Sequence, residues 1–454
     1  MAVKKKKAIK KKIVKKKLVK KTIDERQKSS AKAVPPAYFL SLSVENVRCF
    51  GPKQTIDVSD GKGRPAQWTV ILGDNNTGKT TLLQCFVALE PFLFEKDFIL
   101  SRLMFNLSKF DLSRNKRDEL TISGIAFSLS KINQSTDGMK TEMMVRYHMS
   151  KNYRQETLGG LVCYGYGASR IMGESSLAEK TPGDPSAGLF EDDVKLINAE
   201  EWLLQADYAA IASKSPKLKE KAGDKRDQIR DVLINLLPEV DDIRVAEPTR
   251  DRPKPRVEFK TPYGWVALDG LSLGYRSMIA WMVDLANRMF ERYPNSSNPL
   301  EEPAVVLVDE IDLHLHPKWQ RILMDYLSVR FVNTQFIVTA HSPLVVQAAK
   351  KANVVLLKRE DDHVVIDNNP QSVRGWRADQ ILTSLFELPS GYSVEIEELQ
   401  KQRRKLLSKA KLTTADKKKL EDIESKMGDL ATAETPEDIE AMNIIRRAAE
   451  YLKK

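Results

Sequence analysis

The stretch GDNNTGKT, which runs from Gly73 to Thr80, constrains the fold of this chain more than any other part of its sequence. It fits the pattern G-x-x-x-x-G-K-[ST], and it lies between a predicted strand, WTVIL, and a predicted helix, TTLLQCFVAL. Glycines in such a loop let backbone N–H groups curl around a phosphate, and the N-terminus of the helix adds partial positive charge. The sequence therefore predicts a nucleotide-binding loop at the end of a strand in an α/β fold.

This loop also contains side chains suited to a nucleotide and its metal ion. Lys79 can reach the β- and γ-phosphates, and the Thr80 hydroxyl can bind Mg²⁺. We therefore predict ATP and Mg²⁺ as cofactors. The nucleotide-binding residues predicted in this segment are Gly73, Asn75, Asn76, Gly78, Lys79, Thr80 and Thr81.

A second segment, AVVLVDEIDLHLHPKWQ at residues 304–320, has three possible interpretations: a metal site, an acid–base pair, or a buried strand followed by a polar loop. Beside a phosphate-binding loop, an aliphatic strand that ends in two carboxylates is typical of an ATPase. Asp309 would hold the Mg²⁺ hydration shell, and Glu310 would orient or deprotonate the attacking water. The alternative is a core strand whose acid caps a helix.

Two further patterns lie on either side of that strand. LDGLSLGYRSMIAW contains a turn with Ser272 and Gly274, which opens an amphipathic helix and presents N–H groups to an anion. In FIVTAHSPLVV, His341 follows directly after a predicted strand. A single histidine is usually structural, but at the carboxyl end of a strand in a parallel sheet it borders the ligand crevice.

These four motifs, in this order, resemble the Walker A loop, signature helix, Walker B strand and switch histidine of ABC-type ATPases of the RecF, SMC and OLD group. The resemblance covers roughly residues 38–360. It implies a two-lobed α/β fold, with a parallel P-loop core sheet and an antiparallel β lobe, followed here by a C-terminal helical region. It also implies that two subunits sandwich two nucleotides, so that Ser272 of one subunit contacts the γ-phosphate held by Lys79 of the other. His341 resembles the switch histidine near that phosphate.

Departures from the common motifs indicate a subfamily. The signature LSLGYR differs from the transporter-like LSGGQ, and IDLHLHPKWQ replaces the usual SALD loop. The pair LHLHP and TAHSP is similar to OLD-type ATPases of bacterial defence systems. We therefore assign His314 and His316 to the loop between the two nucleotide sites, and we do not expect them to bind zinc, because no third ligand is evident.

Two absences narrow the prediction further. Lys79 and Ser272 are separated by 193 positions (272 − 79) without sustained heptads, so we expect no long coiled-coil arm. After Pro343, 111 residues remain (454 − 343), part of which completes the ATPase sheet, and none after His363 is histidine. We therefore expect neither a TOPRIM nor an HNH nuclease domain there, and no nuclease activity of the chain itself.

The C-terminal stretch resembles the tail of stand-alone antiphage-defence ATPases, with the Septu ATPase subunit as first candidate and the PARIS ATPase subunit as second. Both work with a separately encoded effector nuclease. YGYGASR, which ends at Arg170, also resembles that group and implies a position near the nucleotide. A buried strand with a turn is the alternative.

The net charge of +11 comes from one end of the chain. Residues 1–21 hold twelve lysines and no acid, so the rest carries about −1 (11 − 12). We expect disorder over residues 1–30 and either nucleic-acid binding by counterion release or a solubilising role. Three widely spaced cysteines and no run of eighteen apolar residues favour a reducing cytoplasm without a membrane span.

The predicted domains are the tail at 1–30, the ATPase domain at 38–374 with a helical and β insertion at about 95–265, and a helical region for assembly or partner binding at 375–454. We expect a cytoplasmic homodimer or higher homo-oligomer that hydrolyses ATP, senses infection, and holds or activates an effector nuclease. The alternative is a RecF-like DNA-binding ATPase in DNA repair or maintenance. A transporter ATPase subunit is disfavoured by the signature and the loop after Walker B.

Overall fold

The structure is a computed structural model. It describes residues 36–94, 98–101, 120–128, 139–147, 161–174, 183–250, 253–349, 352–368, 378–384, 392–409 and 413–427. The chain divides into two compact units, residues 1–376 and 377–454. The predicted tail at 1–30 lies outside the described residues, and so does the part of the predicted helical region after residue 427.

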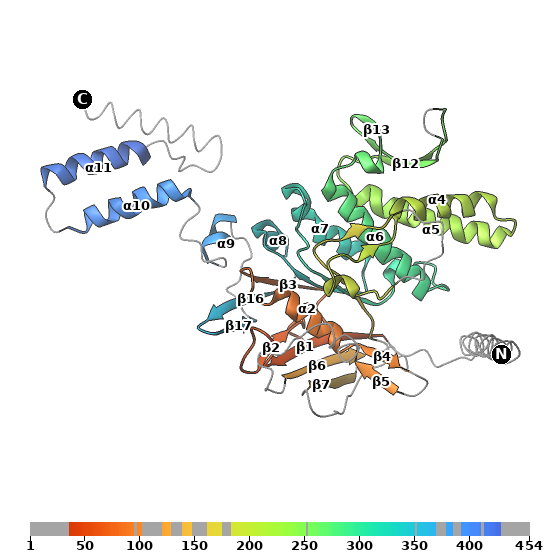
Figure 1. Ribbon diagram of the computed structural model, residues 1–454, viewed down its shortest axis with the longest axis horizontal. Coiled ribbons are helices and arrows are strands. Elements are labelled where there is room, and N and C mark those ends of the chain that lie inside the picture. The colour runs from red at the N-terminus through yellow and green to blue at the C-terminus, as the bar shows by residue number, and fades with distance from the viewer. Residues whose placement is uncertain are drawn as a thin grey trace, which may run out of the picture. The chain divides into compact units, whose positions relative to one another are not determined.

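A six-stranded sheet forms the centre of the first unit, in the order β17-β16-β3-β15-β14-β8 (Figure 1). Its strands are β3 (Trp68–Gly73), β8 (Cys163–Tyr166), β14 (Ala304–Val308), β15 (Thr334–Thr339), β16 (Asn353–Glu360) and β17 (His363–Asp367). All neighbours are parallel except β16 and β17. Every residue of β3, β8, β14 and β15 is buried, as expected for parallel strands covered on both faces.

A four-stranded antiparallel sheet, in the order β2-β1-β6-β7, forms the second lobe. Its strands are β1 (Ala37–Glu45), β2 (Gln54–Asp57), β6 (Leu120–Ser128) and β7 (Met139–Tyr147), and a separate hairpin consists of β4 (Pro91–Phe94) and β5 (Phe98–Ser101). The helix after the phosphate-binding loop, α2 (Lys79–Ala88), contributes to one apolar core with residues of both sheets. Phe39 of β1 and Phe86 of α2 meet edge to face, with ring centroids 4.8 Å apart.

Helices cover the side of the six-stranded sheet that faces away from the antiparallel lobe (Figure 1). They are α4 (Ala199–Ala212), α5 (Pro216–Leu236), α6 (Leu273–Arg292), α7 (Pro317–Arg330) and α8 (Pro343–Ala348). Shorter elements are β9 (Ile171–Met172), β10 (Lys195–Leu196), the three-stranded sheet of β11 (Asp242–Ala246), β12 (Arg256–Thr261) and β13 (Gly264–Ala267), and the 3₁₀ turns η1 (Ala187–Leu189), η2 (Leu268–Gly270) and η3 (Pro299–Glu301). The central helix α6 is buried along most of its length.

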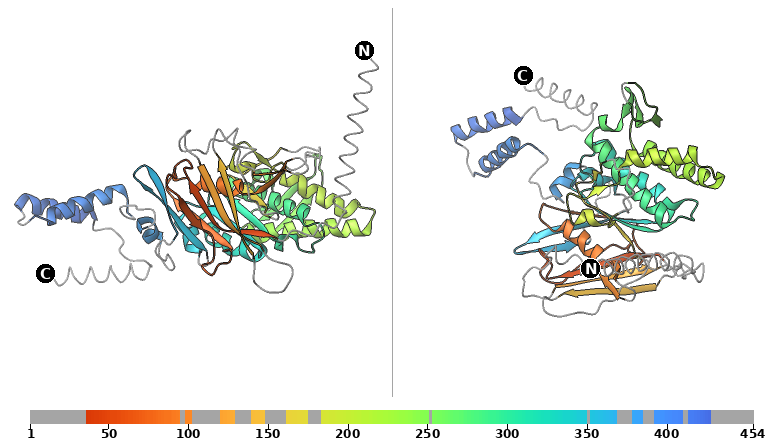
Figure 2. Two further views of the ribbon diagram at one scale, coloured as in Figure 1. Left: turned by 90° about the horizontal axis from the view of Figure 1, so that it is seen from below. Right: turned by 45° about the vertical axis from the view of Figure 1, so that its right-hand side comes forward.

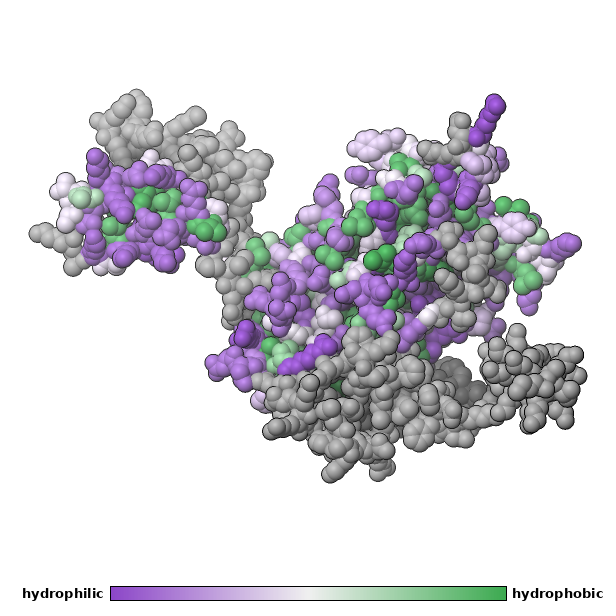
Figure 3. All heavy atoms as spheres, viewed as in Figure 1, coloured by the Kyte–Doolittle hydropathy of each residue, from purple (hydrophilic) through white to green (hydrophobic). Residues whose placement is uncertain are grey.

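The helices α4 and α5 form a short antiparallel pair in place of a coiled-coil arm (Figures 1 and 2). They are 14 and 21 residues long, and the described part of the chain between Lys79 and Ser272 contains no longer helix. Hydrophobic side chains gather at the free end of the pair (Figure 3), where Ile211 and Leu218 are exposed. Among the described residues, no helix has the length and apolar character needed to cross a membrane.

The second unit is helical in its described part, with α9 (Ala378–Ser384), α10 (Val394–Leu407) and α11 (Thr414–Met427). The Ser393 side chain caps α10, and Arg403 pairs with Glu424 across the two longer helices at 3.0 Å. Leu406 and Ile423 are buried. The predicted fold class, a parallel P-loop sheet with an antiparallel lobe and C-terminal helices, is confirmed.

Candidate active site

The phosphate-binding loop connects β3 to α2 through backbone conformations that favour glycine. Gly73 and Gly78 have φ of 152° and 84°, and Asn76 has φ of 64°. A Cβ atom on Gly73 would lie 2.6 Å from the Thr77 hydroxyl, and one on Gly78 would lie 2.4 Å from the Cys49 sulfur. The two glycines of the motif are therefore required by both conformation and space.

The Lys79 ammonium lies inside the loop. It donates to the backbone oxygens of Gly73 and Asp74, each at 2.8 Å. Burial lowers the pKa of Lys79, although the carboxylates of Asp309 and Glu310 act in the opposite direction. Within the part of the chain that the structure describes, the hydrogen-bond partners of this cation are neutral carbonyl oxygens. Close to a helix N-terminus, it is well placed to exchange them for phosphate oxygens.

The end of the Walker B strand meets the loop through a side-chain contact. The Thr80 hydroxyl donates to one oxygen of Asp309 at 2.6 Å, and the Thr339 hydroxyl donates to the other at 2.5 Å. Thr80 lies in the first turn of α2, Asp309 follows β14, and Thr339 ends β15, so three separate elements converge on one carboxylate. The two residues predicted to bind Mg²⁺ are thus in contact.

Glu310, the residue after Asp309, has an unusual backbone conformation. Its φ is 47°, and its N–H donates to the Thr339 hydroxyl at 2.7 Å. The backbone N–H of His341 donates to a carboxylate oxygen of Asp312 at 3.0 Å. The predicted general base and the predicted switch histidine therefore belong to one polar layer beyond the carboxyl ends of β14 and β15.

The signature turn lies at the start of α6. Ser272 is the N-cap residue, exposed and with extended backbone. A Cβ atom on Gly274 would lie 2.3 Å from the backbone oxygen of His314, so the helix start packs tightly on the loop after β14. Within the described residues, no hydrogen bond joins the Ser272 side chain to the phosphate-binding loop.

Of the two histidines after Walker B, His316 makes a structural contact through its ring. His316 caps α7, because its ring nitrogen accepts the backbone N–H of Lys318 at 3.3 Å. His314 has a left-handed backbone with φ of 63°. No group of three or more potential metal-binding side chains of His, Cys, Asp or Glu is found in the described parts of the chain.

Several residues of the site were not found from the sequence. Thr339 contacts both Walker B acids, and the signal for it was a threonine directly after the apolar run Phe336–Val338. Arg48, in the turn after β1, donates to the Thr81 hydroxyl at 3.2 Å and to Gln84 at 3.1 Å. Thr81, predicted to bind nucleotide, therefore directs its buried hydroxyl to the antiparallel lobe.

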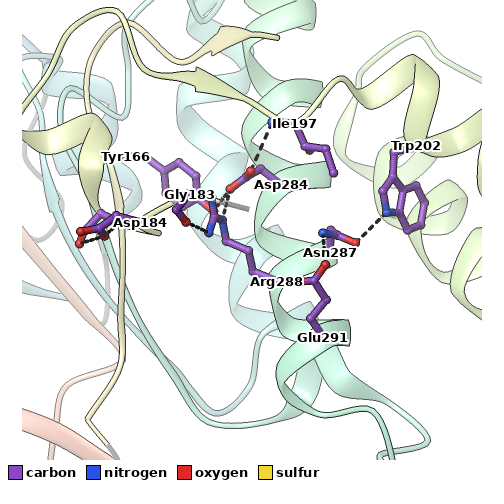
Figure 4. Close-up of polar contacts among 10 residues, drawn as sticks. Tyr166, Gly183, Asp184, Ile197, Trp202, Asp284, Asn287, Arg288 and Glu291 are labelled. Carbon is purple, nitrogen blue, oxygen red and sulfur yellow. Dashed lines mark hydrogen bonds and ion pairs between the residues drawn. The ribbon is translucent and has the colours of Figure 1, made fainter. Parts of the chain in front are cut away.

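A buried polar network fixes α6 to the edge strand β8 (Figure 4). The Tyr166 hydroxyl and the Arg288 guanidinium both donate to one oxygen of Asp284, at 3.0 and 2.6 Å. Arg288 also donates to the backbone oxygen of Gly183 at 3.1 Å. Burial and the neighbouring Asp284 carboxylate raise the pKa of Tyr166 well above its ordinary value, so its proton stays in this network.

Comparison with known proteins gives two family matches. The sequence family described as "AAA domain, putative AbiEii toxin, Type IV TA system" matches residues 183–347. A second family, described as "AAA domain", matches residues 41–240. Together the two matches extend from the antiparallel lobe to α8, across all four predicted motifs.

The chain is also similar to individual proteins. It is 42% identical to "Retron Ec83 probable ATPase" of Escherichia coli over 26% of this chain and 21% of that protein. It is 24% identical to "Septu protein PtuA" of Bacillus mycoides (strain KBAB4) over 79% of this chain and 46% of that protein. Each relative is thus more than twice as long as the part that this chain matches.

Among solved structures, the chain resembles "Crystal structure of the SmcHead bound to the C-winged helix domain of ScpA". The TM-score is 0.46 at 16% identity, over 73% of this chain and 97% of the other. The family matches and the named relatives confirm the predicted resemblance to ABC-type ATPases of antiphage defence.

Proposed function

We propose that this chain binds ATP and hydrolyses it with Mg²⁺. The observation that carries the proposal is the 2.6 Å contact between Thr80 and Asp309, which are 229 positions apart in the chain. The fold joins the two motifs that the sequence assigns to one metal ion. A hydroxyl and a carboxylate are oxygen ligands of the kind that Mg²⁺ prefers, so the residues present fit the ion.

Each residue then has one task in the proposed reaction. Lys79 exchanges the carbonyls of Gly73 and Asp74 for the β- and γ-phosphate oxygens. Bound Mg²⁺ supplies positive charge where the transferred phosphoryl group develops negative charge. Glu310 accepts the proton of the attacking water. His341, whose backbone is held by Asp312, borders the γ-phosphate.

We propose that the site is shared between copies of the chain. Ser272 stands at the exposed start of a 20-residue helix, and its first-turn N–H groups can bind an anion. In one chain Ser272 has no bond to the loop, whereas in a dimer it would contact the γ-phosphate held by the Lys79 of the other copy. Hydrolysis then requires a homodimer or a larger homo-oligomer.

Mixing two inactive variants tests this sharing. Lys79→Ala and Ser272→Arg should each be inactive alone. A mixed dimer keeps one composite site with both residues intact, so random mixing should restore roughly a quarter of the wild-type rate of phosphate release. Native mass spectrometry would show that mixed dimers form. Mixed dimers without any recovered activity would contradict a shared site.

We also propose that the protein acts in the cytoplasm, in antiphage defence, where it senses infection and holds or activates a separately encoded effector nuclease. The similarity to Septu and retron ATPases supports this role. The ATPase domain at 38–374 supplies the nucleotide switch. The helical region at 375–454, with charged and apolar positions interleaved on α10 and α11, is proposed to bind the effector or another copy.

The purified chain is expected not to cleave DNA or RNA with Mg²⁺, Mn²⁺ or Zn²⁺, because its Asp309–Glu310 pair is committed to the nucleotide. Cleavage should appear only when the neighbouring gene product is co-purified. Gel assays on labelled DNA and RNA, with and without that second protein, measure this. Metal-dependent cleavage by the chain alone that disappears in Glu310→Gln would contradict the assignment of Glu310 to ATP.

A further inference from the structure

The turn after β8 runs directly beside the Walker B acids. β8 pairs in parallel with β14, so that Tyr166 stands opposite Val308, and the N–H of Asp309 donates to the backbone oxygen of Tyr166 at 2.8 Å. A Cβ atom on Gly167 would lie 2.0 Å from the backbone oxygen of Gly188. At Gly167 the turn therefore packs too closely against η1 to admit a larger residue. This contact and the hydrogen bond from Asp309 hold the turn beside β14.

Arg170 closes this turn and is directed at the same two acids. Its guanidinium donates to the backbone oxygen of Asp309 at 3.3 Å and to that of Glu310 at 2.8 Å. Only 5% of Arg170 is exposed. Burial lowers its pKa to about 10, against the effect of nearby carboxylates, so the group stays protonated near neutral pH. Its Nε has no hydrogen-bond partner among the described residues.

These bonds hold Glu310 in a backbone conformation that residues with a side chain rarely adopt. Its φ of 47° is left-handed and persists only where surrounding groups enforce it. The Thr339 hydroxyl accepts its N–H, and Arg170 donates to its carbonyl oxygen. Both peptide groups of Glu310 are thereby fixed, and with them the direction of its Cα–Cβ bond.

We infer that Arg170 is a positioning residue, which fixes the Asp309–Glu310 backbone so that the Glu310 carboxylate faces the attacking water. This inference rests on the proposed ATPase function. Among the described residues, Arg170 donates only to backbone oxygens of the two acids, whereas Lys79 and Thr80 keep their own partners without it. Its role should therefore appear in the rate of hydrolysis and leave nucleotide binding intact.

Arg170→Ala should lower kcat by about 10²-fold, because a small misplacement of a catalytic group has an effect of that order. The dissociation constant of a fluorescent ATP analogue should stay close to the wild-type value. Millimolar guanidinium should restore part of kcat with saturation, because it can occupy the vacated position and donate to both carbonyls. Ammonium at the same concentration should restore none. Arg170→Lys should fall between alanine and wild type.

Tyr166→Phe is the matched control. It removes a buried hydrogen bond four residues earlier on the same segment, which the Tyr166 hydroxyl donates to Asp284 (Figure 4). It should lower the melting temperature by about 1–4 °C and leave kcat near wild type. Arg170→Ala with wild-type kcat would overturn the inference. The inference would also be overturned if Arg170→Ala lost no more kcat than a Tyr166→Phe protein of the same stability and guanidinium restored none of that loss.

A crystal structure of Arg170→Ala tests the geometry without turnover. The inference predicts that Glu310 leaves the left-handed region, and an unchanged φ near 47° would contradict it. This readout separates the two proposals. A wild-type protein that releases no phosphate would refute the ATPase function, while the backbone of Glu310 in the variant would still decide the role of Arg170.

Discussion

Lys79→Ala is expected to abolish ATP binding. Lys79 is the only basic residue of GDNNTGKT, so the phosphates lose the only cation of the loop. Charge-assisted hydrogen bonds to phosphate are among the strongest polar contacts in proteins, and affinity should fall by at least about 10²-fold. Isothermal titration calorimetry of the purified variant with ATP and Mg²⁺ measures the change.

A matched control separates the position of Lys79 from its charge. Lys62 is an exposed lysine in the connection that follows β2, and Lys62→Ala removes the same charge outside the loop. That variant should bind ATP as the wild type does. A folded Lys79→Ala protein, shown by an unaltered far-ultraviolet circular dichroism spectrum, with wild-type affinity would refute the assignment of the phosphate-binding loop.

Glu310→Gln is expected to bind ATP and to hydrolyse it about 10²–10⁴-fold more slowly, because an amide cannot accept the proton of the attacking water. Retained nucleotide should then hold two copies together, so the variant should elute as a larger species with ATP than without it. Single-turnover phosphate release and size-exclusion chromatography measure the two effects.

The control for this variant is Glu220→Gln, which makes the same change at an exposed position of α5. Its rate and elution should match those of the wild type. Normal hydrolysis by Glu310→Gln would leave Glu310 as a structural acid at the end of a strand, and another group would have to accept the proton.

The local parts of the site were predictable from short sequence patterns. The helix expected from Thr80 to about Leu89 is observed at Lys79–Ala88, and the strand expected at 304–308 is observed there. A phosphate-binding loop needs glycines at fixed positions, and a buried parallel strand needs an unbroken aliphatic run. Both requirements act within about ten residues, so a single sequence contains them.

The parts that depend on long-range contacts were not predictable. Thr339 lies 30 positions from Asp309, and Arg170 lies 140 positions from Glu310. Their contacts exist because β14 lies between β15 and β8 in the sheet, and the sequence indicated a parallel sheet without the order of its strands. The left-handed backbone of Glu310 is equally hidden, since glutamate has no preference for it.

The observed start of the signature helix differs slightly from the predicted start. The segment from Leu268 was expected to open a helix through a turn, and α6 begins at Leu273, after the 3₁₀ turn η2 and the extended Ser272. Because the helix begins at Leu273, Ser272 lies at the N-cap, the position from which a side chain and first-turn N–H groups face outward. The predicted sharing of the site depends on this placement.

Phosphate release from ATP by the purified chain tests the central proposal most directly. Wild-type protein should release phosphate in the presence of Mg²⁺, and the release should stop when the ion is chelated or when Lys79 is replaced by alanine. Equal background rates for the wild type and for Lys79→Ala, at every protein concentration tested, would contradict the proposal that this chain is an ATPase.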